Sequence, residues 1–385
     1  MSTHQNVLPA ETEATHGFGL PGTSRRPDSG GNGFNPPPNS SSFSLPRAPL
    51  HISFVNTGGS QHSQTLQDLP QRRSARIAAA IQNAEKSRGA QFDILAFCES
   101  RDPKAKYPID NLFSNGRAIY RSLARDDDPA AGIEIHVNIA LPPPSDLLTS
   151  FLSNNGRSDE SIYFQGRFTV HSFNLQDRLL IFAVLYGYAK GGLEGGTLIS
   201  RSNSVLKLIY ERTLTLFPQH IIVTCLVGDF NAFPFWANDL MYTSSSGNNI
   251  STSARTLNAR QACTNLLPSL RPIFAPAPHT LAFAHALAFQ KPDTPLPAKY
   301  TTNTTQRGDS RTATGIDHVL ISHQHGEKFL RCFNHAPLNP GNGQRSPSTH
   351  HLLQFYLKDF WTRPLKGKIP KSSYHILPSY VFRDT

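Results

Sequence analysis

An apolar run leads directly into two polar side chains that could do chemistry, Asp229 and Asn231. The run occupies residues 221–225, and Leu-Val-Gly-Asp-Phe-Asn follows at residues 226–231. Such a run is typical of a strand buried on both faces, so a polar pair is tolerated only at its exposed carboxyl end. Side chains two residues apart on a strand point the same way and could hold a metal ion and a phosphate in one pocket. A turn that satisfies its own backbone is the alternative.

Further polar groups of this kind stand at the ends of predicted strands. In chain order they are Asn56, Glu99, Tyr186, Asp317 and the adjacent histidines His350 and His351. Taken singly, each has an ordinary explanation: a surface acid, a buried aromatic at a strand end, or surface histidines. Their occurrence together with the first pair favours a shared site.

Predicted strands and helices are needed to bring these residues together. Alternation and apolar runs predict strands at residues 51–56, 92–99, 133–139, 164–173, 179–188, 221–225 and 315–322, with a hairpin turn at 175–178. Apolar spacing predicts helices at residues 76–86 and 202–216. The glycine-rich residues 191–196 lack the Lys-Ser/Thr of a phosphate loop, so we expect a flexible loop there. We also expect long surface loops at residues 241–253 and 275–312.

The length of the chain limits the number of domains, and its net charge indicates the class of binding partner. A chain of 385 residues suits one domain of about 250 to 300 residues plus tails. We divide it into a disordered leader at residues 1–46, a folded domain at 47–362 and a basic C-terminal tail at 363–385. The 37 Lys and Arg against 27 Asp and Glu give a net charge of +10, which favours polyanionic partners such as nucleic acid or anionic lipid. A basic charge that only aids solubility is the alternative.

The cysteines and the apolar runs indicate in which cellular compartment the protein is expected. The four cysteines lie far apart, with no Cys-x-x-Cys pair, and are interpreted as buried thiols in a reducing environment: Cys98, Cys225, Cys263 and Cys332. The first residues lack a basic segment followed by an apolar one, and the longest apolar run is about half of what a bilayer needs. We expect a soluble protein of the nucleus or cytoplasm, not secreted and without a transmembrane segment, and leave its oligomeric state open.

Five motifs, in their order and spacing, resemble the endonuclease/exonuclease/phosphatase superfamily. The similarity runs from about residue 50 to 360 through Ile-Ser-Phe-Val-Asn at 52–56, Asp-Ile-Leu-Ala-Phe-Cys-Glu at 93–99, Gly-Asp-Phe-Asn at 228–231, Gly-Ile-Asp-His-Val-Leu at 315–320 and Ser-Thr-His-His at 348–351. The resemblance implies an α+β fold, a two-sheet β-sandwich flanked by helices in four α/β/β/α layers, as in deoxyribonuclease I. It places the active site where strands of both sheets end.

The resemblance further implies a Mg²⁺-dependent phosphodiester hydrolase. Within that family the preferred expectation is an endonuclease acting on nucleic acid, DNA rather than RNA, with Mn²⁺ as a possible alternative metal. Glu99 matches the family's metal ligand, helped by the residue that Asn56 matches. Hard divalent cations prefer such oxygen ligands in an incomplete shell that leaves room for water and phosphate. The leader and the basic tail would suit an endonuclease encoded by a retroelement.

The remaining candidates match residues at the water and the phosphate. Asp229 matches the group that orients or deprotonates the attacking water, and Asn231 a donor to the phosphate. Asp317 and His350 match an orienting acid and the histidine at the scissile phosphate. Tyr186 matches a phosphate-contacting tyrosine.

One position departs from the family pattern. The family usually has Asp immediately before its catalytic histidine, and this chain has Thr349. A hydroxyl cannot supply the missing charge. A catalytically impaired module that binds polyanions therefore stays open as an alternative. A phosphoesterase acting on lipids or inositol phosphates is a separate alternative to the endonuclease.

Overall fold

The computed structural model describes residues 47–58, 70–100, 116–188, 192–231, 241–244, 281–284, 305–307, 310–313, 315–341, 343–344 and 346–362. All of them belong to one compact unit, Leu45–Thr385. The predicted leader at residues 1–46 and the predicted basic tail at 363–385 lie outside the described residues, as does Cys263. The proposed domain limits therefore stay predictions.

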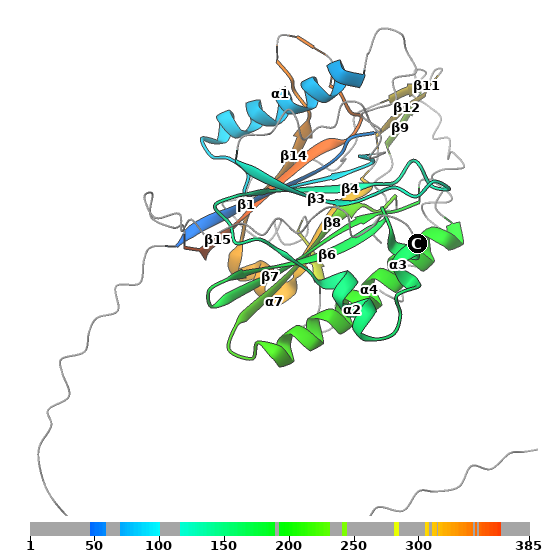
Figure 1. Ribbon diagram of the computed structural model, residues 1–385. Helices are drawn as coiled ribbons and strands as arrows, with labels where there is room; N and C mark the ends of the chain where they lie inside the picture. Colours follow the sequence, from blue (N-terminus) through cyan, green and yellow to red (C-terminus); the bar gives the residue numbers. More distant parts are fainter. Residues whose placement is uncertain are drawn as a thin grey trace, which may run out of the picture. The chain divides into compact units, whose positions relative to one another are not determined.

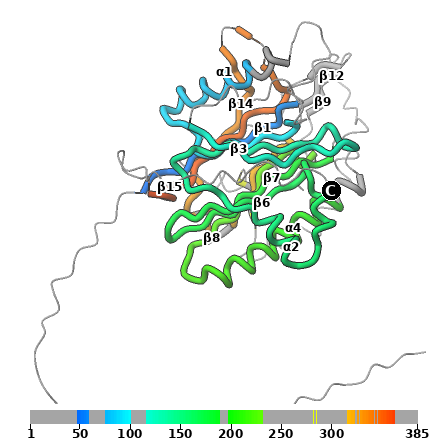
Figure 2. Tube along the Cα trace, viewed as in Figure 1, coloured from blue at the N-terminus to red at the C-terminus, as the bar shows by residue number. Residues whose placement is uncertain are grey.

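Two six-stranded sheets dominate the described part of the chain (Figure 1). The first sheet has the order β14-β15-β1-β2-β4-β3, formed by Leu330–Pro337, His351–Trp361, Ala48–Asn56, Ile94–Cys98, Ile133–Asn138 and Arg117–Ser122. Its strands β1 and β15 come from opposite ends of the described sequence and pair antiparallel, which Figure 2 shows as a blue and a red tube running together. Strands β1 and β2 pair parallel, so their carboxyl ends meet at one edge of the sheet.

The second sheet supplies the other half of the sandwich. Its order is β10-β13-β8-β7-β6-β5, formed by Leu281–Phe283, Asp317–Ser322, Ile221–Asp229, Arg178–Tyr186, Phe168–Leu175 and Ser145–Asp146. The central strands β7 and β8 run parallel, joined by helix α4 (Gly192–Leu216). A third, small sheet contains β11 (Thr305–Arg307), β12 (Ser310–Ala313) and β9 (Met241–Ser244). Helix α7 (His323–Phe329) links β13 to β14.

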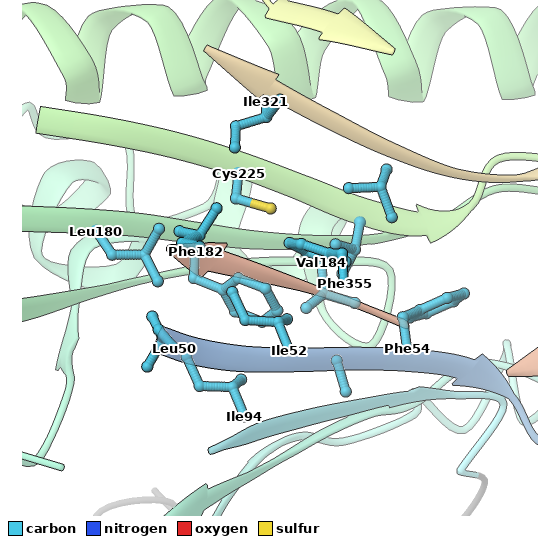
Figure 3. Close-up of a cluster of buried hydrophobic side chains, with 14 of the residues drawn as sticks. Leu50, Ile52, Phe54, Ile94, Leu180, Phe182, Val184, Cys225, Ile321 and Phe355 are labelled. Atoms are coloured by element: carbon cyan, nitrogen blue, oxygen red, sulfur yellow. The ribbon is translucent and has the colours of Figure 1, made fainter. Parts of the chain in front are cut away.

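Alternating side chains on the strands build three apolar layers. On β7 the residues Leu180, Phe182 and Val184 face the first sheet, where they meet Ile52 and Phe355 (Figure 3). The intervening residues of β7 pack instead on helices α2 (Leu147–Asn154), α3 (Glu160–Phe164) and α4. Helix α1 (Pro70–Arg88) covers the opposite face of the first sheet. These layers give the predicted α/β/β/α sandwich, and burial on both faces explains why β7 is an almost uninterrupted apolar run.

Most predicted elements are confirmed, and some boundaries were wrong. The expected hairpin joins β6 to β7, with Leu175 opposite Arg178 and Gln176 in the left-handed region at φ 69°. Residues 192–196, expected to be a loop, begin helix α4, because their glycines are followed by a long apolar face that packs on the second sheet. Phe164 ends helix α3, so the expected strand at 164–173 begins only at Phe168. Short strands interrupt both expected long loops.

Two expectations about compartment can be compared with the structure. Cys98 and Cys225 are buried free thiols as predicted, whereas Cys332 is exposed, because it sits at an irregularity in the pairing of β14 with β15, where φ is 52°. None of the helices in the described part of the chain combines the length and apolar character that crossing a bilayer demands.

Candidate active site

Strand ends from both sheets deliver the predicted polar residues to one place. Asn56 is the last residue of β1, and Glu99 directly follows β2, its parallel neighbour. In the second sheet Tyr186 ends β7 and Asp229 ends β8, and the two residues are register partners. Asp317 begins β13 opposite Asp229. The strand pairing therefore fixes the positions of these side chains.

Glu99 is held by two donors from different strands. The Tyr186 hydroxyl donates to Glu99 Oε1 at 2.5 Å, and Asn56 Nδ2 lies 3.4 Å from the same oxygen. Asn56 Nδ2 also donates to Asp229 Oδ2 at 2.8 Å, and Asn56 is fully buried. Burial and the neighbouring carboxylates Glu99 and Asp229 raise the pKa of Tyr186, so its hydroxyl stays protonated and acts as a donor. Asn56 thus connects the carboxylates of the two sheets.

The turn after β8 combines local backbone satisfaction with a contact to the next strand. Asp229 Oδ1 accepts from the backbone N–H of Asn231 at 2.8 Å. This is the turn chemistry that the sequence left open as an alternative. The other Asp229 oxygen nonetheless accepts from Asn56, so the carboxylate also belongs to the site. Asn231 Nδ2 donates to the Gly187 carbonyl at 3.1 Å, which fixes the orientation of its amide.

Backbone conformations at the site are unusual in two ways. Glu99 and Asn231 both lie in the left-handed region, at φ 53° and 49°, where a residue with a side chain is strained. Gly228 is required by close approach of β7, because a Cβ there would lie 1.9 Å from the Leu185 carbonyl oxygen. A Cβ on Gly187 would lie 2.2 Å from the Phe230 carbonyl oxygen. Two of the five described non-glycine residues with positive φ, and two glycines that have no room for a Cβ, thus lie at this cluster.

His350 forms a buried pair with Asp317. Its Nδ1 lies 2.9 and 3.0 Å from the two oxygens of Asp317, and its Nε2 faces Asp229 Oδ2 at 3.9 Å. Burial lowers the pKa of His350, but the charge of Asp317 and the hydrogen bond to it reverse this effect and raise the pKa to about 9. The imidazole is therefore cationic at neutral pH.

Asp229 titrates close to neutrality. Burial and the nearby charge of Asp317 raise its pKa to about 7, against the opposing influence of His350 and of its hydrogen bonds from Asn231 and Asn56. A carboxylate with this pKa can both accept and release a proton at neutral pH. A carboxyl group with a raised pKa thus lies beside a histidine with a raised pKa.

The donor set fits a hard divalent cation at Glu99. Its carboxylate, only partly buried, supplies oxygen ligands of the type that Mg²⁺ prefers. The Asn56 amide now presents its nitrogen to that carboxylate, and its oxygen accepts from the Gly58 amide. Asp229, Asp317 and His350 also bring ligand atoms within 4.8 Å of one another. That second group is a poorer fit to Mg²⁺, because one of its three ligands is an imidazole nitrogen in place of an oxygen.

The structure brings together seven predicted site residues and separates one. The connected set is Asn56, Glu99, Tyr186, Asp229, Asn231, Asp317 and His350. His351 turns away: its Nδ1 lies 3.0 Å from His335 Nδ1, and burial together with His335 lowers its pKa to about 4. Thr349 is exposed.

Sequence reasoning assigned no role to Ser348. Its buried hydroxyl donates to the Asn56 carbonyl at 2.7 Å and accepts from the His350 amide at 3.1 Å. Ser348 therefore connects the end of β1 to the start of the histidine segment. The signal was present, since a serine two residues before a candidate histidine can bond that residue's backbone amide.

Among the comparisons with known proteins, one solved structure supports the fold. No family model matches the chain, and no curated protein matches it. Among solved structures, the AP endonuclease LMAP from Leishmania major superposes with a TM-score of 0.53 at 12% sequence identity, covering 81% of this chain and 88% of that chain. TDP2 from C. elegans gives 0.49 at 14% identity over 83% of this chain and 78% of that chain. The endonuclease domain of TRAS1, a telomere-specific non-LTR retrotransposon, gives 0.43 at 14% identity over 80% of this chain and 98% of that chain.

Proposed function

Because the chain has the fold of the endonuclease/exonuclease/phosphatase superfamily, we propose that it is a Mg²⁺-dependent phosphodiesterase, acting as an endonuclease on nucleic acid. One observation carries the proposal. Asn56 and Asp229 connect the Glu99 carboxylate of the first sheet to the His350–Asp317 pair through contacts of 3.4, 2.8 and 3.9 Å. A cation ligand, a base and a protonated histidine thus share one small space, which is what hydrolysis of a phosphate ester requires.

Asp229 and Asn231 act on the water and the phosphate in this proposal. Asp229, with a pKa of about 7, accepts a proton from the attacking water as the water oxygen bonds to phosphorus. The bond between phosphorus and the leaving alcohol oxygen breaks in the same displacement, and that oxygen takes up a proton from solvent water. Asn231, oriented by Gly187, donates from its amide to a phosphate oxygen as negative charge builds. Loss of one such donor costs about 3 kcal/mol of barrier.

His350 and Tyr186 act through charge and position. The protonated imidazole presents Nε2–H on the side of Asp229, where it stabilises the phosphate, while Asp317 fixes the ring through Nδ1. Tyr186 aligns the Glu99 carboxylate through its short hydrogen bond. In this proposal its hydroxyl also lies near enough to contact the phosphate.

Glu99 and Asn56 would hold the metal, which we propose to be Mg²⁺, with Mn²⁺ able to replace it. When bound, the cation neutralises charge on the non-bridging oxygens and on the leaving group. Asn56 must turn its amide for this role, because its Oδ1 now accepts from the Gly58 amide at 2.7 Å and its Nδ2 faces the carboxylates. The Asn56 Nδ2 group thus lies between the carboxylates of Glu99 and Asp229.

The net charge of +10 supports nucleic acid as the substrate, and DNA rather than RNA is our preferred choice. Nucleases among the structures of the same fold, such as the AP endonuclease from Leishmania major, are compatible with this choice. Thr349 favours one competitor, a module that binds polyanions without cleaving them, because the exposed position before His350 carries no charge. Cleavage of inositol polyphosphates or sphingomyelin instead of DNA would identify the chain as a lipid or inositol-phosphate phosphoesterase.

Nicking of supercoiled plasmid with and without Mg²⁺ tests the proposal. We expect Mg²⁺-dependent conversion to open circles, and its loss in Glu99→Gln, which removes the charge but keeps the shape. Glu211→Gln is the matched control, since Glu211 is an exposed acid of α4 whose ion pair with Lys207 lies 3.8 Å apart. Binding of plasmid without turnover in the unmutated protein would refute the enzyme and favour the binding module.

A further inference from the structure

Arg167 is a buried cation beside the proposed site that plays no part in the roles assigned above. It directly precedes β6, only 5% of its surface is exposed, and its carbonyl accepts the Tyr186 amide at 2.8 Å. A buried guanidinium is costly unless its donors are paired. The partners that Arg167 has acquired are therefore informative.

One set of partners lies at the exit of β7. The guanidinium nitrogen Nη1 donates to the Gly187 carbonyl at 3.0 Å and lies 3.4 Å from the Tyr186 carbonyl. The guanidinium carbon also lies 4.3 Å from the centre of the Tyr186 ring and 4.5 Å from that of Tyr188. A cation held over aromatic faces at this distance is attracted to them. Arg167 thus fixes both the backbone and the rings where β7 ends.

The second partner is Asp128, in the loop between β3 and β4. Arg167 Nε and Nη2 donate to its two carboxylate oxygens at 2.6 and 2.7 Å, a bidentate pair. The side chain of Asp128 is 21% exposed and that of Arg167 only 6%, so a partly exposed carboxylate neutralises the buried cation. This fork geometry is one that lysine cannot reproduce.

The Gly187 carbonyl connects Arg167 to the proposed chemistry. It accepts Arg167 Nη1 at 3.0 Å and Asn231 Nδ2 at 3.1 Å. The ring over which the cation lies carries the hydroxyl that donates to Glu99 at 2.5 Å. Arg167 therefore contacts the Tyr186 ring directly and shares the Gly187 carbonyl as a hydrogen-bond acceptor with the Asn231 side chain.

We propose that Arg167, anchored by Asp128, is a positioning residue for the active site: it fixes the end of β7 so that Tyr186 reaches Glu99 and Asn231 keeps its amide orientation. This inference rests on the proposed phosphodiesterase function for its kinetic consequences. The structural part of the inference is independent of that function: the Tyr186–Glu99 and Asn231–Gly187 contacts depend on the Arg167 guanidinium.

The test replaces Arg167 by Lys and compares metal-free crystal structures of the variant and the unmutated protein. We expect the variant to lose the Tyr186 hydroxyl contact with Glu99 or the Asn231 contact with Gly187. Arg157→Lys is the matched control, because the Arg157 side chain makes a bidentate pair with Glu160 of α3 at 2.8 and 2.9 Å, and within the described part of the chain it forms no hydrogen bond to β7. Preservation of both site contacts in Arg167→Lys would overturn the proposal. Should Arg167→Lys fail to fold, Asp128→Asn, at the more exposed partner, takes its place with the same two outcomes.

Kinetics on plasmid DNA give the second readout. A misplacement of about 1 Å can cost up to about 100-fold in rate, so we expect kcat to fall about tenfold to 100-fold in Arg167→Lys with KM nearly unchanged. The loss should shrink in a Tyr186→Phe background, since the hydroxyl to be positioned is then absent. An equal loss in both backgrounds would contradict positioning through Tyr186. If the unmutated protein does not cleave DNA, the proposed function fails, and the crystallographic comparison still decides the role of Arg167.

Discussion

His350 and His351 are neighbours in the chain and both are buried, yet their pKa values shift in opposite directions. The first lies against the Asp317 carboxylate, and its pKa is raised to about 9. The second lies against the His335 imidazole, and its pKa is lowered to about 4. Burial alone lowers the pKa of both groups. The partner therefore decides the protonation state, and alternation at the start of β15 gives each histidine a different partner.

This difference explains why one of the two can serve the proposed chemistry. A cationic imidazole next to Asp229 can stabilise a phosphate, whereas a neutral imidazole paired with a second imidazole has no such charge to offer. Of these two adjacent positions, one thus lies in the proposed site and the other pairs with His335 outside it. Four experiments can break or sharpen this contrast.

The largest effect is expected from His350→Gln. We expect Mg²⁺-dependent plasmid cleavage to fall by about 1000-fold, because the proton and the charge near the phosphate are removed. His351→Gln should leave the rate within about twofold, because its partner is His335. Equal losses in the two variants, with folding verified by circular dichroism, would remove the functional distinction.

A smaller loss of activity, about 100-fold, is expected from Asp317→Asn. Without the anion the pKa of His350 falls from about 9, and the pKa of Asp229 falls too, since Asp317 raises both. NMR titration of the imidazoles in metal-free protein measures the first shift directly, and the pH–rate profile should move to lower pH on both limbs. Asp177→Asn, which removes a carboxylate paired with Arg47 at 2.7 Å, is the control. An unchanged His350 titration in Asp317→Asn would contradict the account.

Thr349→Asp should sharpen the contrast by adding charge beside His350. The exposed threonine supplies no carboxylate, so we expect the substitution to tighten the apparent Mg²⁺ affinity by about tenfold. The Mg²⁺ dependence of plasmid nicking measures this, and Thr349→Asn controls for size without charge. If Thr349→Asp and Thr349→Asn behave alike, the missing carboxylate is not what limits the metal site.

The smallest effect concerns stability in acid. In the unfolded chain a histidine binds its proton near pH 6.5, whereas His351 in the folded protein does so only near pH 4, so its contribution to stability is lost as the pH falls through this interval. His351→Gln should therefore reduce the decrease in unfolding free energy between pH 6.5 and 4 by about 1 to 2 kcal/mol, after allowance for solvent screening. Urea titrations at both pH values measure it. A parallel loss in the variant and the unmutated protein would show that His351 does not titrate as described.

The sequence was sufficient to predict which strands end in polar residues and that these side chains lie close together. Continuous apolar runs in the sequence predict strands well where both faces of the strand are buried, as in β7 and β8. The sequence was insufficient where a contact between distant residues decides the secondary structure or the side-chain partner. Residues 192–196 are glycine-rich and locally favour a loop, yet they begin α4. Nothing local in the Ser-Thr-His-His motif indicates that only the first histidine meets Asp317, since His335 lies 16 residues away from its partner His351.

Arg167 illustrates the same limit at the site itself. Its signal in the sequence is a lone cation between a glycine and an apolar strand, a pattern that does not identify Asp128 or the Gly187 carbonyl as partners. Those contacts span 39 and 20 residues and depend on the packing of β6 against β7. Residues that position others are therefore harder to infer from sequence than residues that carry the reactive groups.

Crystals of the protein soaked with Mn²⁺ and a short DNA strand test the central claim most directly, by anomalous scattering of the metal. We predict a metal peak within coordination distance of the Glu99 carboxylate and a phosphate between Asn231 and His350. A metal bound instead by Asp229, Asp317 and His350, with none at Glu99, would contradict the account.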